Sequence, residues 1–123
     1  MPNKSILIVE DNPINLKLVY VLLSTEGYKV KFATDAEEAL IMLREFHPAL
    51  ILMDLQLPGM DGLQLTKILK ENPQTKDTII IALTAYAMKG DEEKALNAGC
   101  DSYITKPISI NNLLSTIERY LKK

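Results

Sequence analysis

The stretch ILMDLQLPGMDG, residues 51–62, leads from a run of apolar residues directly into an aspartate and then a proline–glycine loop. Such a run predicts a β-strand that is covered on both faces. The proline and glycine end the strand, and Asp61 is placed to cap a following helix. Asp54 stands at the end of the strand, where an unpaired carboxylate is unfavourable. We therefore expect that other groups stabilise this charge or that the protein uses it.

Outward from this stretch, apolar runs alternate with helix-like segments along the whole chain. The expected strands cover residues 5–10, 29–33, 50–54, 79–83 and 102–105, and the alternating pattern of KVKFA (29–33) favours a place near the sheet edge. Strict alternation of strands and helices predicts a parallel sheet with helices on both faces. Five units are too few for an eightfold barrel, so the predicted fold class is α/β with one open, doubly wound sheet.

Capping residues mark where each expected helix starts, and glycine or proline marks where several of them stop. The expected starts are Asn12 with Pro13, Asp35 with a capping-box Glu38, Asp61, about Lys89, and Ser109. The expected ends are Glu26 before Gly27, a residue before Pro73, and Ala98 before Gly99. Helical spacing predicts that the residues facing the core are Ala36, Ala39, Leu40, Leu43, Leu65, Ile68, Leu69, Ala95, Leu96, Ala98, Leu113, Leu114, Ile117 and Leu121.

Composition and charge restrict the class of protein. The chain has 123 residues, of which 47% are hydrophobic and 24% charged, and this suits one folded domain over residues 1–123. Its net charge of −2 is not the basic footprint of a nucleic-acid binder. Cys100 is the only cysteine, which excludes an internal disulfide, and it is expected to pack as a small residue. Without a membrane-length apolar run or a signal peptide, we expect a cytoplasmic protein with no membrane or nucleic-acid partner.

Polar residues stand where four of the expected strands end. Glu10 and Asp11 end the first, Asp54 closes the third, Thr84 follows the fourth, and Lys106 follows the fifth. In an open parallel sheet, the ligand crevice lies outside the carboxyl ends of the strands. We therefore expect these acids, the hydroxyl and the amine to converge on a single edge of the sheet.

Three carboxylates at one edge need more positive charge than Lys106 supplies. Two carboxylates about 4 Å apart repel each other by roughly 4 kcal/mol at an effective dielectric of about 20. A hard divalent cation restores the balance, and Mg²⁺ needs only a few carboxylates while it keeps its waters. The sequence therefore predicts Mg²⁺ as the cofactor, held by Glu10, Asp11 and Asp54. Asp54 beside such an ion is a candidate nucleophile for a phosphoryl group, whose oxygens Thr84 and Lys106 would bind.

Four segments together resemble the receiver domain of bacterial two-component response regulators. In chain order they are ILIVEDN (6–12), LILMDLQLPGMDG (50–62), IIALTAYA (80–87) and YITKPI (103–108). The resemblance covers essentially the whole chain, and TAYAMKGDEEK (84–94), AGC (98–100) and TKPIS (105–109) resemble in particular the single-domain regulators of cell division. It implies a flavodoxin-like sheet in the order 2-1-3-4-5. That order places Asp11 and Asp54 on adjacent strands beside the switch point.

The resemblance also implies a role for the acids. Asp54 matches the phospho-acceptor, and Glu10 with Asp11 matches the acidic pair that holds Mg²⁺. The backbone carbonyl of Gln56, together with Asp54, matches the remaining protein ligands of the ion. The phosphoryl group would come from a histidine kinase or a histidine phosphotransferase. This makes the protein a signalling switch in a phosphorelay rather than an enzyme with a separate substrate.

The remaining matched residues concern switching and turnover. Thr84 matches the switch hydroxyl, Tyr103 the switch aromatic, and Lys106 the lysine of the family pattern. Gln56 and Tyr86 match positions that tune how fast water removes the phosphoryl group. A downstream protein is expected on the face formed by the fourth helix, fifth strand and fifth helix, and the chain itself is expected to be a monomer or a weak dimer.

Three other function classes stay open on the sequence. An aspartyl-phosphate hydrolase resembling the haloacid dehalogenases places a second acid two residues after the nucleophile, where this chain has Gln56. A flavodoxin-type cofactor binder needs a hydroxyl- and glycine-rich loop after the first strand, where EDNPIN (10–15) instead presents two acids. A binding module that has lost phosphorylation would keep the same fold, although all the key residue types are present here.

Overall fold

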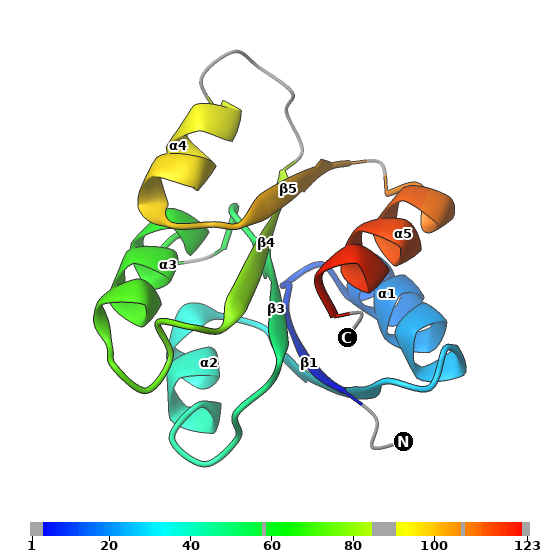
Figure 1. Ribbon diagram of the computed structural model, residues 1–123, viewed down its shortest axis with the longest axis horizontal. Helices are drawn as coiled ribbons and strands as arrows, with labels where there is room; N and C mark the ends of the chain where they lie inside the picture. The colour runs from blue at the N-terminus through cyan, green and yellow to red at the C-terminus, as the bar shows by residue number, and fades with distance from the viewer. Residues whose placement is uncertain (1–3, 58, 85–90, 107, 122–123) are drawn as a thin grey trace.

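The computed structural model describes residues 4–57, 59–84, 91–106 and 108–121. Within them, a five-stranded parallel sheet in the order β2-β1-β3-β4-β5 lies between two layers of helices (Figure 1), which confirms the predicted fold class and strand order. The strands are β1 (Ser5–Val9), β2 (Lys29–Ala33), β3 (Leu50–Asp54), β4 (Ile79–Thr84) and β5 (Ser102–Thr105). The helices are α1 (Pro13–Thr25), α2 (Ala36–Met42), α3 (Gly62–Glu71), α4 (Asp91–Ala98) and α5 (Ile110–Leu121). In these ranges no helix combines the length and the apolar content needed to cross a membrane.

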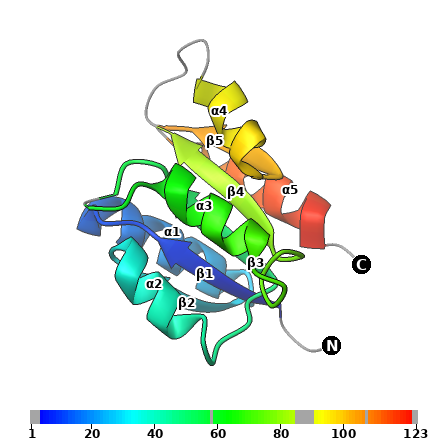
Figure 2. The same cartoon turned by 90° about the vertical axis from the view of Figure 1, so that its left-hand side faces the viewer.

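The sheet separates two hydrophobic clusters, because successive residues of a strand point to opposite faces. Leu7 and Val9 of β1 pack in the cluster under α2, α3 and α4, the layer that faces the viewer in Figure 2. Ile6 and Ile8 pack in the cluster under α1 and α5. All of β3 is buried, as its apolar run predicted, whereas the edge strand β2 leaves Lys29, Lys31 and Phe32 exposed.

The strand register places the polar residues of the strand ends side by side. Val9 of β1 pairs with Met53 of β3, so the residues that follow them, Glu10 and Asp54, leave the sheet at the same level. Asp54 pairs in turn with Leu83 of β4. On the far side, the backbone N–H of Lys106 donates to the carbonyl of Thr84 at 2.7 Å. The predicted convergence therefore follows from the register of parallel pairs.

The helix caps agree with the sequence in all but one detail. Asp61 and Ser109 each accept a hydrogen bond from the backbone N–H three residues later, at 2.9 and 3.4 Å. Asp35 accepts the N–H of Glu38 at 2.8 Å, as a capping box requires. The Glu38 carboxylate, however, accepts the N–H of Thr34 at 2.7 Å rather than that of Asp35. The side chain of Glu38 in this capping box therefore binds the backbone of the residue before Asp35, one position earlier than predicted.

Some boundaries and core positions differ from the prediction. The first strand ends one residue earlier, at Val9, and the fourth extends one residue further, to Thr84. Leu96 was predicted to face the core but is exposed, because residues three apart share a helix face and Ala95 and Ala98 occupy it. The predicted start of this helix at Lys89 lies outside the described residues.

On α3, Ile68 was likewise predicted to face the core and is instead exposed. Thr66 takes an inward position beside Leu65 and Leu69. Its hydroxyl donates to the carbonyl of Gly62 at 2.7 Å, which satisfies the buried polar group within the helix. A polar residue can therefore occupy the inward arc without an unpaired hydrogen-bonding group.

Candidate functional site

Acidic side chains from two neighbouring strands meet at the carboxyl end of the sheet. Glu10 and Asp11 follow β1, and Asp54 is the last residue of β3. One carboxylate oxygen from each of the three lies within 4.8 Å of the others. Glu10 and Asp54 are buried, with side chains only 1% and 3% exposed, whereas Asp11 is exposed. The three acids predicted from the sequence are thus brought together in one cluster.

Lys106 extends its side chain into this cluster. Its Nζ donates to Asp54 Oδ2 at 3.1 Å and lies 3.2 Å from Glu10 Oε1. Burial alone would lower the pKa of this ammonium group, but the charges of Asp54 and then Glu10 more than offset that, so the pKa of Lys106 is raised. Lys106 therefore remains positively charged between two buried carboxylates.

The acid cluster carries more negative charge than Lys106 neutralises. The pKa of Glu10 is raised from 4.5 to about 7, first by burial and then by its hydrogen bond and charge interaction with Asp54. The backbone N–H of Asn12 and the charge of Lys106 act in the opposite direction without cancelling this rise. In the protein alone, Glu10 thus holds a proton up to nearly neutral pH.

The oxygen atoms of the cluster suit a hard divalent cation. Glu10 Oε2 accepts the N–H of Asn12 at 3.1 Å, and Asp54 Oδ1 accepts that of Gln56 at 2.9 Å. Glu10 Oε1 is buried beside Lys106 but accepts no hydrogen bond from the residues that the structure describes. A buried carboxylate oxygen of this kind, within reach of two other carboxylates, fits the all-oxygen coordination of Mg²⁺.

A cavity of about 530 Å³ opens over these groups and is large enough for a phosphoryl group. Its lining residues are Glu10, Asp11, Asn12, Pro13, Asn15, Asp54, Gln56 and Lys106. Sequence reasoning did not assign Asn15 to the site. The signal was present in the predicted cap: Asn12 Oδ1 accepts the N–H groups of Ile14 and Asn15 at 2.9 and 3.1 Å, which turns the start of α1 over the acids. The first turn of α1 is therefore part of the site.

The residues predicted to act in switching lie on β4 and β5 rather than in the lining of this cavity. Thr84 is buried at the end of β4 and, with Gln56, lines a smaller cavity of about 150 Å³ beside the acid cluster. Tyr103 on β5 is half-buried and packs against the cluster under α2, α3 and α4. Tyr86, predicted to tune turnover, lies outside the described residues.

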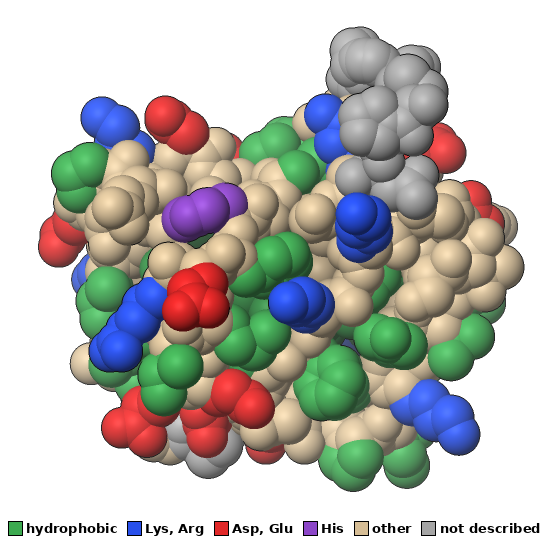
Figure 3. Space-filling model, turned by 90° about the horizontal axis from the view of Figure 1, so that it is seen from below, with side chains coloured by type: hydrophobic (Ala, Val, Ile, Leu, Met, Phe, Trp, Pro, Cys, Tyr) green, Lys and Arg blue, Asp and Glu red, His purple; other side chains and the backbone are tan. Residues whose placement is uncertain are grey.

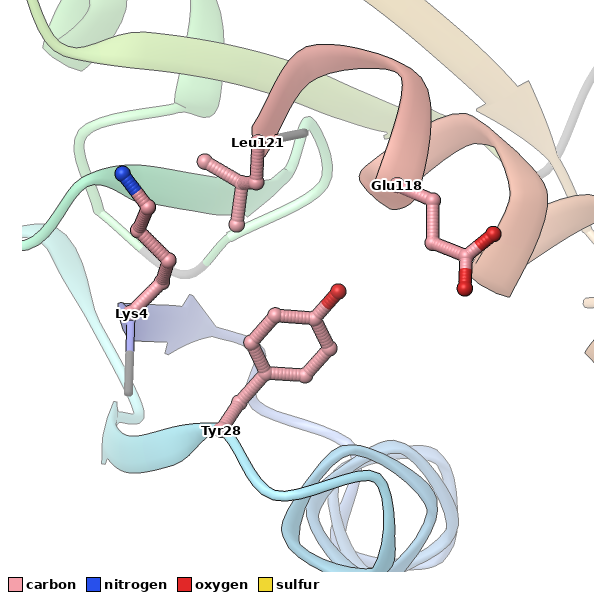
Figure 4. Close-up of a pocket in the computed structure, with 4 residues that line it drawn as sticks. All are labelled: Lys4, Tyr28, Glu118 and Leu121. Atoms are coloured by element: carbon pink, nitrogen blue, oxygen red, sulfur yellow. The ribbon is translucent and has the colours of Figure 1, made fainter. Parts of the chain in front are cut away.

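A second hollow, of about 280 Å³, lies at the opposite end of the molecule, where β1 begins. Lys4, Tyr28, Glu118 and Leu121 line it (Figure 4), and burial followed by the charges of Glu118 and Glu26 raises the pKa of Tyr28. Around this end, acidic, basic and hydrophobic side chains are interspersed (Figure 3). Ligands of open α/β sheets bind at the other end, beyond the carboxyl ends of the strands. The acid cluster is accordingly the better functional candidate.

Comparison with known proteins agrees with this choice. Residues 6–118 match the family described as the response regulator receiver domain. The chain is 48% identical over 118 residues to the polar-differentiation response regulator DivK of Brucella ovis, covering 96% of both chains. Among solved structures, it superposes on the receiver domain of a sensor histidine kinase of Pseudomonas aeruginosa with a TM-score of 0.91 at 34% identity, covering 99% of this chain and 100% of that one. That receiver domain has a magnesium ion coordinated in its active-site cleft. The chemotaxis response regulator CheY4 of Vibrio cholerae superposes with a TM-score of 0.92 at 28% identity, covering 98% of this chain and 100% of CheY4.

Proposed function

The chain belongs to the response regulator receiver domain family, and from this premise we propose that Asp54 accepts a phosphoryl group from a phosphohistidine. The donor would be a histidine kinase or a histidine phosphotransferase. The observation that carries this proposal is the buried carboxylate of Asp54, held 3.1 Å from Lys106 at the base of an acidic cavity. A buried carboxylate is unfavourable unless other groups neutralise it. The placement of such a group beside a lysine at the base of an open cavity therefore supports a chemical use.

In the proposed transfer, a carboxylate oxygen of Asp54 forms a bond to phosphorus while the bond from phosphorus to the histidine nitrogen breaks. The histidine leaves with the bonding electron pair. Lys106 would hold one phosphoryl oxygen by a charge-assisted hydrogen bond, since its ammonium group already lies next to Asp54. The hydroxyl of Thr84 would hold another. The donor group would enter the cavity over Asp54, which residues at the start of α1 help to line.

The residues that would hold Mg²⁺ are Glu10, Asp11, Asp54 and, through its backbone carbonyl, Gln56. When bound, the ion supplies positive charge that offsets the charge of the phosphoryl oxygens. The buried Oε1 of Glu10, which accepts no hydrogen bond within the described part of the chain, supports this assignment. The pKa of Glu10 is raised first by burial and then by its hydrogen bond and charge interaction with Asp54, so a cation beside it would stabilise its charged form.

The proposed response links the phosphoryl group to a surface. Thr84 would move toward a phosphoryl oxygen, and Tyr103 on the neighbouring strand would change its packing in consequence. The face formed by α4, β5 and α5 would then present a different surface to a downstream protein. Gln56 and Tyr86 would tune the attack of water on the acyl phosphate. We expect such a switch to act in the cytoplasm, as a monomer or a weak dimer.

The phosphodonor has to contact the rim of the cavity, and α1 offers an apolar surface there. Ile14, Leu18 and Val21 form an exposed row along this helix at a helical spacing of four and three residues. Ile14 is 79% exposed and stands in the first turn, directly after the cap that lines the cavity. We therefore propose that the protein that carries the phosphohistidine contacts this row.

Acetyl phosphate with Mg²⁺ tests the proposal without a partner protein. The expected result is a mass gain of one phosphoryl group that is lost in Asp54→Asn and kept in Asp77→Asn, an exposed aspartate remote from the cluster in sequence. No gain in the native protein would instead favour a binding module that has lost phosphorylation. Steady turnover of several phosphomonoesters would favour an aspartyl-phosphate hydrolase.

A further inference from the structure

Gly62, the first residue of α3, packs against the backbone at the end of β3, which carries one acid of the cluster. Its helical conformation suits any residue, unlike the positive φ angles of Gly27, Gly59 and Gly99. The constraint on this position is therefore space. An ideal Cβ at Gly62 would lie 2.5 Å from the backbone oxygen of Asp54 and 2.8 Å from the Cα of Leu55. Both are backbone atoms, which cannot rotate away as the end of a side chain can.

Two hydrogen bonds hold Gly62 in this close contact. Its N–H donates to the carbonyl of Leu55 at 3.2 Å, and its carbonyl accepts the hydroxyl of the buried Thr66 at 2.7 Å. One and two turns further along, Leu65 and Leu69 anchor α3 in the core. The start of the helix is thus fixed against the peptide that follows β3.

The segment in front of Gly62 carries two groups of the proposed site, the carboxylate of Asp54 and the carbonyl of Gln56. Asp54 Oδ1 accepts the N–H of Gln56 at 2.9 Å, so a displacement of this segment moves both groups together. We propose that Gly62 is a positioning residue, whose lack of a side chain lets α3 set the place of Asp54 and Gln56. The proposal rests on the proposed function, because it concerns the geometry of the acceptor and of the metal ligands.

The substitution Gly62→Ala tests this directly, and Gly27→Ala is a matched control. Gly27 follows α1 with a φ of 97°, and a Cβ there meets no described atom within 4 Å. Both variants are expected to lose stability, Gly62→Ala through contact and Gly27→Ala through backbone strain. The measurements are the backbone amide NMR signals of Leu55 and Gln56, the affinity for Mg²⁺ and the rate of phosphorylation by acetyl phosphate.

Gly62→Ala should move both amide signals and reduce the rate by roughly 10- to 100-fold, because misplacing a reacting group by about 1 Å has effects of this order. Gly27→Ala should lower the melting temperature and leave all three measurements at their native values. Native amide signals, Mg²⁺ affinity and rate in a folded Gly62→Ala protein would overturn the proposal.

A second variant decides the matter if Gly62→Ala does not fold. Thr66→Val keeps the side-chain shape and removes the hydrogen bond to the Gly62 carbonyl. It should change the amide signals of Leu55 and Gln56 and the rate in the same sense but less, whereas native values in this variant would count against the proposal. If the native protein takes no phosphoryl group at all, the proposed function fails, and the amide signals still report whether Gly62 sets the position of this segment.

Discussion

Both ends of the sheet place a lysine beside an aspartate, but they leave the charges in different states. At the end where β4 and β5 begin, Lys70 Nζ lies 3.4 Å from Asp101 Oδ2. The same ammonium group donates to the carbonyl of Thr78 at 2.8 Å, and Asp101 Oδ2 accepts the N–H of Ile80 at 2.9 Å. Both side chains are partly exposed, so water completes their solvation. This pair joins one cation to one anion, and the other groups that the two side chains bind are backbone atoms of the fold.

At the carboxyl end, Lys106 instead faces two buried carboxylates, those of Glu10 and Asp54, with Asp11 beside them. The ratio of charges is unbalanced, and the pKa of Glu10 is raised, first by its burial and then by its interactions with Asp54. The same residue types therefore serve packing at one end and suit chemistry at the other. Burial and charge ratio make the difference, and each can be changed by substitution.

Removal of the lysine at each end should give the largest contrast. Lys106→Ala takes away the cation next to Asp54, so the rate of phosphorylation by acetyl phosphate should fall by roughly 10²–10³-fold, as when a donor to a developing negative charge is lost. Lys70→Ala should leave this rate unchanged and lower the melting temperature. Mass spectrometry over time gives the rate for both variants. Equal rates in the two variants would mean that Lys106 is only structural.

The pH dependence of stability should report the buried acid at the carboxyl end. Folding raises the pKa of Glu10 from 4.5 to about 7, so the folded protein binds this proton more tightly than the unfolded chain. The metal-free protein should therefore lose stability as pH rises from 4.5 to about 7, by as much as about 3 kcal/mol, with no further loss above that range. Denaturant unfolding in the presence of a chelator, at about pH 5 and about pH 8, measures this difference.

Glu10→Gln should flatten that pH dependence, because the amide does not titrate. Glu93→Gln replaces an exposed glutamate on α4 and should keep the native profile. Mg²⁺ should stabilise the native protein more at the higher pH, where the proton no longer competes for the carboxylate. A Glu10→Gln profile as steep as the native one would show that other groups cause the dependence.

Loss of an exposed acid should lower the affinity for Mg²⁺ without lowering the stability of the fold. Asp11→Ala removes one proposed Mg²⁺ ligand whose side chain is exposed. The affinity for Mg²⁺ should therefore fall by about 10-fold or more, while the free energy of unfolding changes little. Asp101→Ala breaks the structural pair, so it should cost about 1–3 kcal/mol of unfolding free energy and leave Mg²⁺ affinity unchanged. Calorimetric titration with Mg²⁺ and denaturant unfolding give the two values. Unchanged affinity in Asp11→Ala would remove this residue from the proposed metal site.

Much of this contrast could be predicted from the sequence, because both the fold and the acid cluster depend on strand ends. A continuous apolar run such as residues 50–54 indicates a buried central strand, and the polar residue that ends it must then lie at the crevice. Glu10, Asp54 and Lys106 were found in this way. Their burial and the two contacts of Lys106 depend on side-chain packing between distant segments, which sequence spacing does not give.

The errors have physical causes as well. Ile68 and Leu96 are hydrophobic and were therefore predicted to face the core, whereas other residues of their helices occupy the core-facing side. Thr66 and Thr116 are buried because their hydroxyls find partners within their own helices, at the Gly62 carbonyl and at Asn112 Oδ1. Only the three-dimensional path of the chain shows that Gly62 needs space rather than an unusual φ.

The smallest expected effect concerns how a partner approaches the acid end. Ile14→Ala removes the most exposed apolar side chain beside the cavity, so transfer from a phosphorylated cognate histidine kinase should slow by about 5- to 10-fold, the equivalent of a contact of about 1 kcal/mol. Phosphorylation by acetyl phosphate should keep its native rate, because the small donor needs no docking surface. Ile41→Ala on α2 is the matched control, since Ile41 is also an exposed isoleucine but stands on another helix, outside the first turn of α1. If both donors slow equally in Ile14→Ala, the side chain supports the start of α1 and the acid cluster beneath it rather than the docking of a partner.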